Sequence, residues 1–295
     1  MKVVARCLPS DKTRLVKVAQ EMGMVVGMTG DGVNDGPALS NADIGFGLGS
    51  GTEVAKEAAD IVVLDDNIRS IENAVHYGRT IYRSIQKFIT FQLTVNVAAI
   101  SIAFIGPFLG FKLPLTMIQL LWVNLIMDTL AALAFSGEPP LPDHMEEKPK
   151  KRDENIITSG MWQSILFNGF FMTAVCLVFL KSKWIGELFT GPEAFMTAFF
   201  GVFVFLNNFN KFNVRVEGMN LLAHIFLNKG FIRVVGMIFL IQIVITYAGG
   251  EMFRTVPLAL HEWFWVVVFS IVIIPFDLLR KFVCLRINKQ GDLQA

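Results

Sequence analysis

The sequence predicts a two-part protein, in which an α/β unit with a parallel sheet precedes an all-α bundle of membrane helices. Three observations carry this prediction. Short apolar runs alternate with helical stretches over about the first 85 residues. The 295 residues are 53% hydrophobic, with a mean hydropathy of +0.53 and only 17% charged residues. After the first part, six apolar stretches are each about long enough to cross a bilayer.

The first part contains the elements of an alternating α/β fold. Helices are expected where polar and apolar residues recur at helical spacing, at 9–23, 34–42 and 52–59. Apolar runs between them predict strands at 1–7, 24–29, 43–49 and 60–65. Strands that alternate with helices imply a parallel sheet that is covered by helices.

The turn "TGDGVND", residues 29–35, follows the second of these strands. Ligands of open parallel sheets bind at the carboxyl ends of the strands, which is where this turn falls. Acidic, glycine-rich turns commonly hold a metal ion or a phosphate group. The sequence therefore predicts an active-site loop here.

From Asn67 the pattern changes to one long helix, amphipathic and charged at first and then almost wholly apolar. Ser70 to Pro107 would span about 55 Å without a break. We expect a soluble domain at 1–66, a stalk helix at 67–87, a transmembrane domain at 88–280 and a tail at 281–295. The six expected spans lie near 88–108, 115–135, 161–181, 195–211, 231–248 and 259–279. The span near 195–211 is the weakest, because amides crowd its end.

The distribution of basic residues predicts the orientation in the membrane. With residue 1 in the cytosol, twelve Lys and Arg fall on the cytosolic connections and four on the opposite side. Both ends are therefore expected in the cytosol of a multi-pass membrane protein. The net charge of +1 and the lack of a basic stripe argue against nucleic acid as a partner.

Polar residues inside the spans mark a candidate cation site. Asn124 and Asp128 are four residues apart and would share a helical face, and Asn96 lies in the first span. Apart from Asp277 near the last cytosolic end, Asp128 is the only carboxylate well inside a span. An acid at that depth is costly, so a functional role is expected, although amides alone can serve as contacts between helices. Oxygen ligands suit Ca²⁺, which needs about six to eight of them. Three residues leave the site incomplete.

The segments "MTGDGVNDGPALSNADIGFGLGSGTEVAKEAADIVVLDDN", "GRTIYRSIQKFITFQLTVNV" and "QLLWVNLIMDTLAALA" resemble the carboxyl-terminal half of P-type cation-transporting ATPases. Within that family they are most similar to the plasma-membrane-type calcium pumps. The resemblance covers nearly the whole chain and implies a haloacid-dehalogenase-like, Rossmann-like phosphorylation domain for the first part.

The resemblance also assigns roles to residues of the loop. Asp31 would coordinate Mg²⁺, Asp35 would hold the loop and assist phosphoryl transfer, and Lys12 would contact the phosphoryl oxygens. A cation, a lysine and backbone amides are what phosphoryl transfer from ATP requires. Without the loop, Lys12 would be interpreted as a solvated lysine at a helix start. Backbone approach to the bound group is assigned to Gly30, Gly32 and Asn34.

The cation site carries over by position as well. Asn96, Asn124 and Asp128 match membrane ligands of the calcium pumps. Ala99, Met127 and Asn207 stand where two-site relatives have ligands, so the resemblance implies one Ca²⁺ per cycle. The long helix from Asn67 would couple the loop to this site.

The sequence contains no "DKTGT" phosphorylation motif, and no nucleotide-binding domain, actuator loop or first four membrane helices are recognised. We therefore expect a carboxyl-terminal part of a calcium pump, inactive alone. Its partners would be Ca²⁺, membrane lipid and the missing amino-terminal half, which would bind most of the ATP. A plasma (inner) membrane location is expected. Two alternatives stay open: a pump of the same family for Mn²⁺ or another cation, and a non-catalytic membrane partner.

Overall fold

The computed structural model describes residues 7–111 and 114–292, with side chains as far as Ile287. The strand expected at 1–7 lies almost entirely outside the described residues. The chain divides into two compact units. The first unit contains the residues up to Ile81 and the segment Pro140–Ile156, and the second contains Tyr82–Pro139 and the residues from Ile157 onwards. The division falls inside helix α4, Ile68–Phe108, which is a single α-helix of 41 residues.

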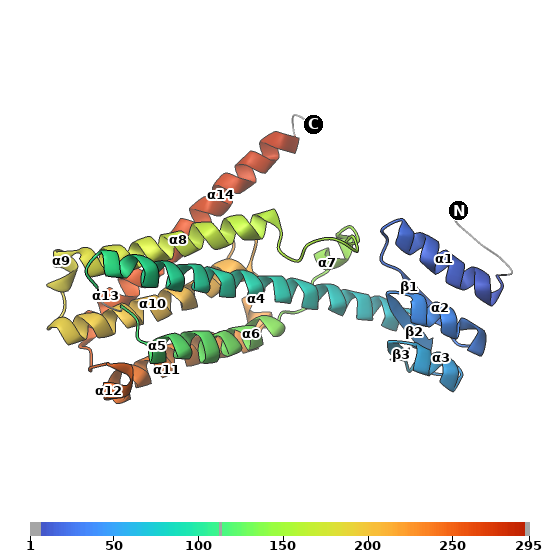
Figure 1. The fold of residues 1–295 in the computed structure, drawn as a ribbon, viewed down its shortest axis with the longest axis horizontal. Helices are drawn as coiled ribbons and strands as arrows, with labels where there is room; N and C mark the ends of the chain where they lie inside the picture. The colour runs from blue at the N-terminus through green and yellow to red at the C-terminus, as the bar shows by residue number, and fades with distance from the viewer. Residues whose placement is uncertain (1–6, 112–113, 293–295) are drawn as a thin grey trace. The chain divides into compact units, whose positions relative to one another are not determined.

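The first unit is built on a sheet of three parallel strands (Figure 1). The strands are β1 (Gly27–Gly30), β2 (Ile44–Leu48) and β3 (Ile61–Val63), paired in that order with Gly30 opposite Gly47 and Phe46 opposite Ile61. Helices α2 (Gly36–Asn41) and α3 (Glu53–Ala58) connect successive strands, and α1 (Pro9–Glu21) precedes β1. The predicted parallel pairing is thus confirmed. Three strands do not by themselves show a haloacid-dehalogenase-like fold.

The segment Pro140–Ile156 is attached to the start of α4 within the first unit. It contains the short helix α7, Asp143–Glu146. Arg79 of α4 donates hydrogen bonds to the carbonyl oxygens of His144 and Glu147, each at 2.9 Å. His76 Nε2 lies 2.7 Å from the carbonyl oxygen of Leu141. These contacts satisfy backbone groups of a segment with little secondary structure of its own.

The second unit is helical, and its helices are drawn in green to red in Figure 1. Helix α10 (Pro192–Arg215) lies in the interior of this unit, and its residues Phe199, Phe200 and Phe203 are fully buried. Its remaining elements beside α4 are α5 (Met117–Leu121), a π-helical segment (Trp122–Met127), α6 (Asp128–Ser136), α8 (Ser159–Lys181), α9 (Lys183–Gly186), α10 (Pro192–Arg215), a 3₁₀ turn (Ile225–Leu227), α11 (Lys229–Ala248), α12 (Gly250–Phe253), α13 (Leu260–Ile271) and α14 (Ile273–Asp292).

Among the described residues, four helical stretches are long and apolar enough to cross a membrane: Ile68–Phe108, Met117–Ser136, Ser159–Lys181 and Lys229–Ala248. The spans expected near 195–211 and 259–279 are not among them. The first of these corresponds to α10, whose asparagines and basic residues lower its hydropathy. The second is interrupted, because α13 ends at Ile271 and α14 starts at Ile273. Pro275 has no N–H to continue the ladder across this break.

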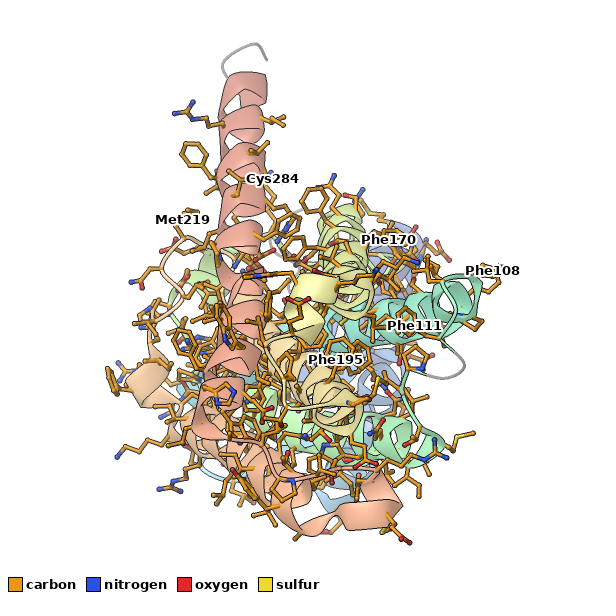
Figure 2. The ribbon with its side chains drawn as sticks, turned by 90° about the vertical axis from the view of Figure 1, so that its left-hand side faces the viewer. Phe108, Phe111, Phe170, Phe195, Met219 and Cys284 are labelled. Carbon is orange, nitrogen blue, oxygen red and sulfur yellow. The ribbon has the colours of Figure 1, made fainter. Side chains whose placement is uncertain are left out.

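The outer surface of the second unit is apolar. Figure 2 shows Phe108 and Phe170 on the outside of their helices, and both side chains are exposed. Along α4, Ile100 and Phe104 are also exposed at four-residue spacing. In contrast, the ring of Phe195 stacks inside on Phe179, with centroids 5.1 Å apart. An apolar exterior of this kind is suited to acyl chains or to further helices.

Candidate functional site

The loop that follows β1 presents an exposed acid on a fixed backbone. Asp31 is the first residue after the strand, and its side chain is exposed. Its carbonyl oxygen accepts a hydrogen bond from the backbone N–H of Thr52 at 2.8 Å. The backbone of Asp31 is therefore anchored at the carboxyl edge of the sheet, and its carboxylate is exposed.

Asp35 is buried under the same loop and holds it together. Its Oδ2 accepts hydrogen bonds from the backbone N–H groups of Asp31 and Gly32, at 3.3 and 3.4 Å. Its Oδ1 accepts from Lys12 Nζ at 2.6 Å. Burial raises the pKa of Asp35, but the hydrogen bonds from Lys12 and from the two backbone groups outweigh it and leave the pKa below its ordinary value. The hydrogen bond to Asp35 also raises the pKa of Lys12. Lys12 and Asp35 thus meet as a charged pair.

The predicted glycines are not equivalent. A Cβ atom at Gly30 would lie 2.5 Å from the Cβ of Asp35, so any side chain there would displace Asp35. At Gly32 the nearest atom would be 3.8 Å away, which is ordinary contact. Asn34 is exposed. The sequence interpretation missed Gly51, where a Cβ would lie 2.8 Å from the carbonyl oxygen of Asp31. Its signal is the second glycine of "GSGT", three residues after the end of β2 at Leu48.

The acid predicted inside the membrane is buried without a partner. Asp128, the first residue of α6, is only 3% exposed, and neither carboxylate oxygen has a hydrogen-bond partner among the described residues. Unpaired buried carboxylates are rare because ionised groups are costly to desolvate. Such a group is a candidate for binding a cation that the chain itself does not contain.

The two predicted amide ligands lie in different environments. Asn124 is exposed and belongs to the π-helical segment, whereas Asn96 on α4 is half-buried. The shared helical face of Asn124 and Asp128 stays a prediction, and the segment between them is π-helical, with i→i+5 hydrogen bonding, rather than α-helical. Of the positions expected to lack ligands, Ala99 and Met127 are buried, and Asn207 is buried with its Oδ1 unpaired.

A buried lysine next to the acid was not foreseen. Lys211 of α10 is fully buried, and its charge acts on Asp128. Its Nζ donates a hydrogen bond to Asn208 Oδ1 at 3.0 Å and lies 5.1 Å from the ring centroid of Phe91. The sequence signal was the run "LNNFNKFNVR", whose amides indicated a weak span rather than a polar interior face.

Among the described parts of the chain, no three His, Cys, Asp or Glu side chains converge as a metal site. Asp35 lies beside Asp31, but its carboxylate is engaged by Lys12 and by the loop backbone. Asp31 and Asp128 both fit hard cations by ligand type.

Comparisons with known proteins place these observations in a family. Residues 112–283, more than half of the chain, match the family model described as "Cation transporting ATPase, C-terminus". This chain belongs to the cation-transporting ATPase family. The matched region includes α6 with Asp128 and α10 with Lys211.

Three relatives of this cation-transporting ATPase chain illustrate its similarities. It is 42% identical over 292 residues to "Calcium-transporting ATPase 9, plasma membrane-type" of Arabidopsis thaliana, covering 95% of this chain and 27% of that protein. It is 43% identical over 285 residues to "Plasma membrane calcium-transporting ATPase 3" of Homo sapiens, covering 90% and 23%. It is 40% identical over 297 residues to "Probable calcium-transporting ATPase 6, plasma membrane-type" of Oryza sativa subsp. japonica, covering 98% and 29%. The chain spans about a quarter of the length of these relatives.

Proposed function

We propose that this chain forms part of an ATP-driven pump that moves Ca²⁺ out of the cytosol through one ion site. Asp128 carries the proposal, because it is a buried carboxylate whose two oxygens have no hydrogen-bond partner in the part of the chain that the structure describes. The names of the relatives support Ca²⁺ as the ion. A divalent cation would neutralise Asp128 more completely than the single charge of Lys211 does.

Asn96 and Asn124 are proposed as further ligands of this Ca²⁺. Asn124 is exposed between Leu121 and Leu125, which are exposed as well. An amide facing hydrocarbon at this depth would be left without hydrogen bonds, so a protein helix rather than lipid is the expected neighbour. We infer that a helix of the amino-terminal part of the pump covers this face and supplies the missing oxygen ligands.

The loop after β1 is proposed to serve phosphoryl transfer in a haloacid-dehalogenase-like domain. Asp31 would hold Mg²⁺, which neutralises charge on the transferred group. Lys12 would orient a phosphoryl oxygen from its position against Asp35, and the backbone at Gly30, Gly32 and Asn34 would line the approach. The aspartate that accepts phosphate from ATP would come from the amino-terminal part of the pump.

The proposed topology has six membrane spans with both termini in the cytosol of a plasma (inner) membrane. In this topology, α10 and the interrupted helix α13–α14 are spans in addition to the four apolar stretches. The depth of burial of α10 supports this, since polar spans are tolerated in the interior of a bundle. The excess of basic residues on one set of connections supports the orientation.

The test of the proposed function is ATP-driven uptake of radioactive Ca²⁺ into inside-out vesicles that contain the whole pump. Asp128→Asn should reduce uptake to background, because the amide cannot neutralise the ion. Asp277→Asn is the matched control. Asp277 is also buried, but it is engaged by Asn168 Nδ2 at 2.8 Å and Arg280 Nε at 2.7 Å. Its variant should keep the Ca²⁺ dependence of uptake. Full uptake by Asp128→Asn would refute the site, and uptake of Mn²⁺ without Ca²⁺ would refute the ion.

A further inference from the structure

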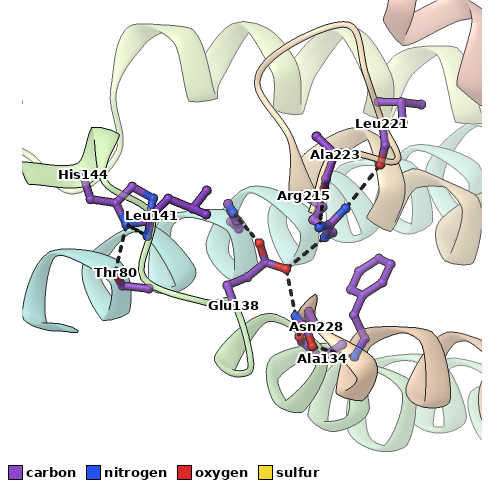
Figure 3. A network of polar contacts seen from close by, with 11 residues as sticks. Thr80, Ala134, Glu138, Leu141, His144, Arg215, Leu221, Ala223 and Asn228 are labelled. Carbon is purple, nitrogen blue, oxygen red and sulfur yellow. Dashed lines mark hydrogen bonds and ion pairs between the residues drawn. The ribbon is translucent and has the colours of Figure 1, made fainter. Parts of the chain in front are cut away.

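Glu138, ten residues after Asp128, is the centre of a buried ion cluster (Figure 3). Glu138 Oε2 pairs with Lys87 Nζ of α4 at 3.1 Å. Its Oε1 accepts hydrogen bonds from Arg215 Nε at 2.9 Å and Asn228 Nδ2 at 2.8 Å. The donors come from α4, from the end of α10 and from the residue that precedes α11. One carboxylate therefore ties three helices to the end of α6.

Two of the three donors of this Glu138 cluster, Arg215 and Asn228, are themselves fixed. Arg215 also donates to the carbonyl oxygens of Leu221 and Ala223, at 3.3 and 2.6 Å. Asn228 donates to the carbonyl oxygen of Ala134 at 3.0 Å. Its Oδ1 would lie 2.9 Å from a Cβ at position 137, so glycine is needed there. The cluster is a closed network rather than a set of loose surface pairs.

The cluster is charged as well as buried. The side chains of Glu138 and Arg215 are 8% and 1% exposed, and that of Lys87 is 19% exposed. Burial raises the pKa of Glu138, but the charge of Lys87, the hydrogen bond from Asn228 and the charge of Arg215 together bring it below its ordinary value. Buried ion pairs often contribute little net stability, because desolvation offsets the attraction. Their best-attested use is to fix the register of helices.

The spacing along the two helices shows which register this pair would fix. Asn96 lies nine residues beyond Lys87 on α4, and Asp128 lies ten residues before Glu138 on α6. At a rise of about 1.5 Å per residue, the distances from the pair are about 13 and 15 Å. Figure 1 shows α4 and α6 running in opposite directions, so residues about equally far from the pair lie at about the same depth. By this measure the two proposed ligands lie at about the same depth.

We propose that Lys87 and Glu138 are positioning residues, whose ion pair sets the relative depth of Asn96 and Asp128 and thereby the affinity for the transported cation. The inference rests on the proposed function for the identity of the ion. It adds two residues outside the ion site to those that determine how tightly the ion is held. Arg215 of α10 also pairs with Glu138, so the cluster fixes the part of α10 that carries Lys211, one turn earlier, relative to the end of α6.

Lys87→Met tests this proposal selectively, because it releases α4 and leaves Arg215 and Asn228 on Glu138. In the whole pump, this variant should raise the half-saturating Ca²⁺ concentration about tenfold, within the range by which residues that do not contact a ligand change its binding. The maximal rate at saturating Ca²⁺ should be retained. Lys87→Arg keeps the charge and should stay near the wild type.

Arg280→Met is the control for loss of a buried ion pair as such. Arg280 pairs with Asp277 on α14, a helix that carries none of the proposed ligands. This variant should lower the melting temperature without moving the half-saturating Ca²⁺ concentration. If Lys87→Met behaves in the same way, the pair is structural only and the proposal is wrong.

A distance measurement keeps the test independent of transport. Spin labels at the exposed positions Ile100 on α4 and Leu133 on α6, with Cys7 and Cys284 replaced by serine, report the register of the two helices. Lys87→Met should shift or broaden the distance distribution, and Arg280→Met should not. An unchanged distribution would overturn the proposal. A shifted distribution in a pump that transports no Ca²⁺ would overturn only the proposed ion.

Discussion

Two carboxylates ten residues apart have opposite surroundings in this chain. Glu138 is engaged by Lys87, Arg215 and Asn228, whereas Asp128 is buried and neither of its oxygens receives a hydrogen bond from residues 7–111 or 114–292. Both side chains are removed from solvent, so burial does not distinguish them. The difference lies in pairing. A carboxylate with every oxygen satisfied holds a structure together, and one left open is available for a cation that arrives from outside.

The same contrast recurs in the first unit. Asp35 is buried and paired with Lys12, and Asp31 beside it is exposed with an anchored backbone. Each unit thus has a paired acid near an open one in the sequence, four residues away in the first unit and ten in the second. The open member is the proposed ligand in both cases.

The largest expected effect separates Glu138 from Asp128 by stability. Glu138→Ala should lower the free energy of unfolding by about 3–5 kcal/mol, because it leaves Lys87 and Arg215 buried without their partner. Asp128→Asn removes an unpaired buried charge and should leave the free energy of unfolding unchanged or raised. Unfolding in mixed micelles measures both. Equal losses in the two variants would remove the distinction on which the comparison depends.

A smaller effect is expected in the loop of the first unit. Gly30→Ala should cost about 1–3 kcal/mol of stability, because the added methyl group would overlap the Cβ of Asp35. Gly32→Ala, whose methyl group meets nothing closer than 3.8 Å, should stay within about 0.5 kcal/mol. Thermal melts of the two variants are the measurement. Similar melting temperatures would show that Asp35 does not need its present position.

The buried charge of Lys211 is expected to affect the affinity for a cation at Asp128. Its charge acts on Asp128, so it competes with the incoming cation. Lys211→Met should lower the half-saturating Ca²⁺ concentration about tenfold, equivalent to about 1.4 kcal/mol. Ca²⁺ titration of transport gives the value, with Lys229→Met at an exposed helix start as the control. An increase in the half-saturating concentration would mean that Lys211 supports the site rather than competing for it.

The smallest effect is expected from the Lys12–Asp35 pair under acid. The pKa of Asp35 is lowered from its ordinary 3.8 on folding. Its stabilisation is therefore complete above about pH 4 and is lost as the pH falls through the folded value. Because Lys12 is 37% exposed, the pair contributes at most about 1 kcal/mol. Stability measured from pH 6 downward should decline less steeply in Lys12→Met. Parallel declines would show that the pair carries no pH dependence.

The elements of the first unit were predictable because local pattern and turn chemistry agree there. The alternation of strands and helices predicted the parallel pairing of β1, β2 and β3, and the turn "TGDGVND" follows β1 as expected. Asp128 could be recognised as a candidate because an acid within an apolar run stands out in the sequence itself. The π-helical segment before it was not foreseen, because no local residue pattern distinguishes it from an α-helix.

The partners of these residues could not be predicted, because they are brought together by packing. Glu138 meets Arg215 across 77 positions of sequence, and nothing near either residue indicates the pairing. Lys211 was expected at the end of the weak span near 195–211 rather than in the interior, although it is fully buried. The break after Ile271 was hidden because the apolar composition continues through it. Composition indicates which segments can lie in lipid, but it does not indicate where a helix is interrupted.

A helix with the composition of α10 is expected to enter lipid less readily than its apolar neighbours. Lys211 and Arg215 lie in its last two turns and cost less than the roughly 2.5–3.5 kcal/mol of a basic residue at the centre of an isolated span, but its four asparagines add to that penalty. On the proposed topology, α10 leaves the insertion machinery only together with neighbours that cover its polar side. The order in which helices emerge during synthesis then matters. Because α11 and α13, which pack against α10, are made after it, α10 is expected to stay at the insertion machinery until they emerge.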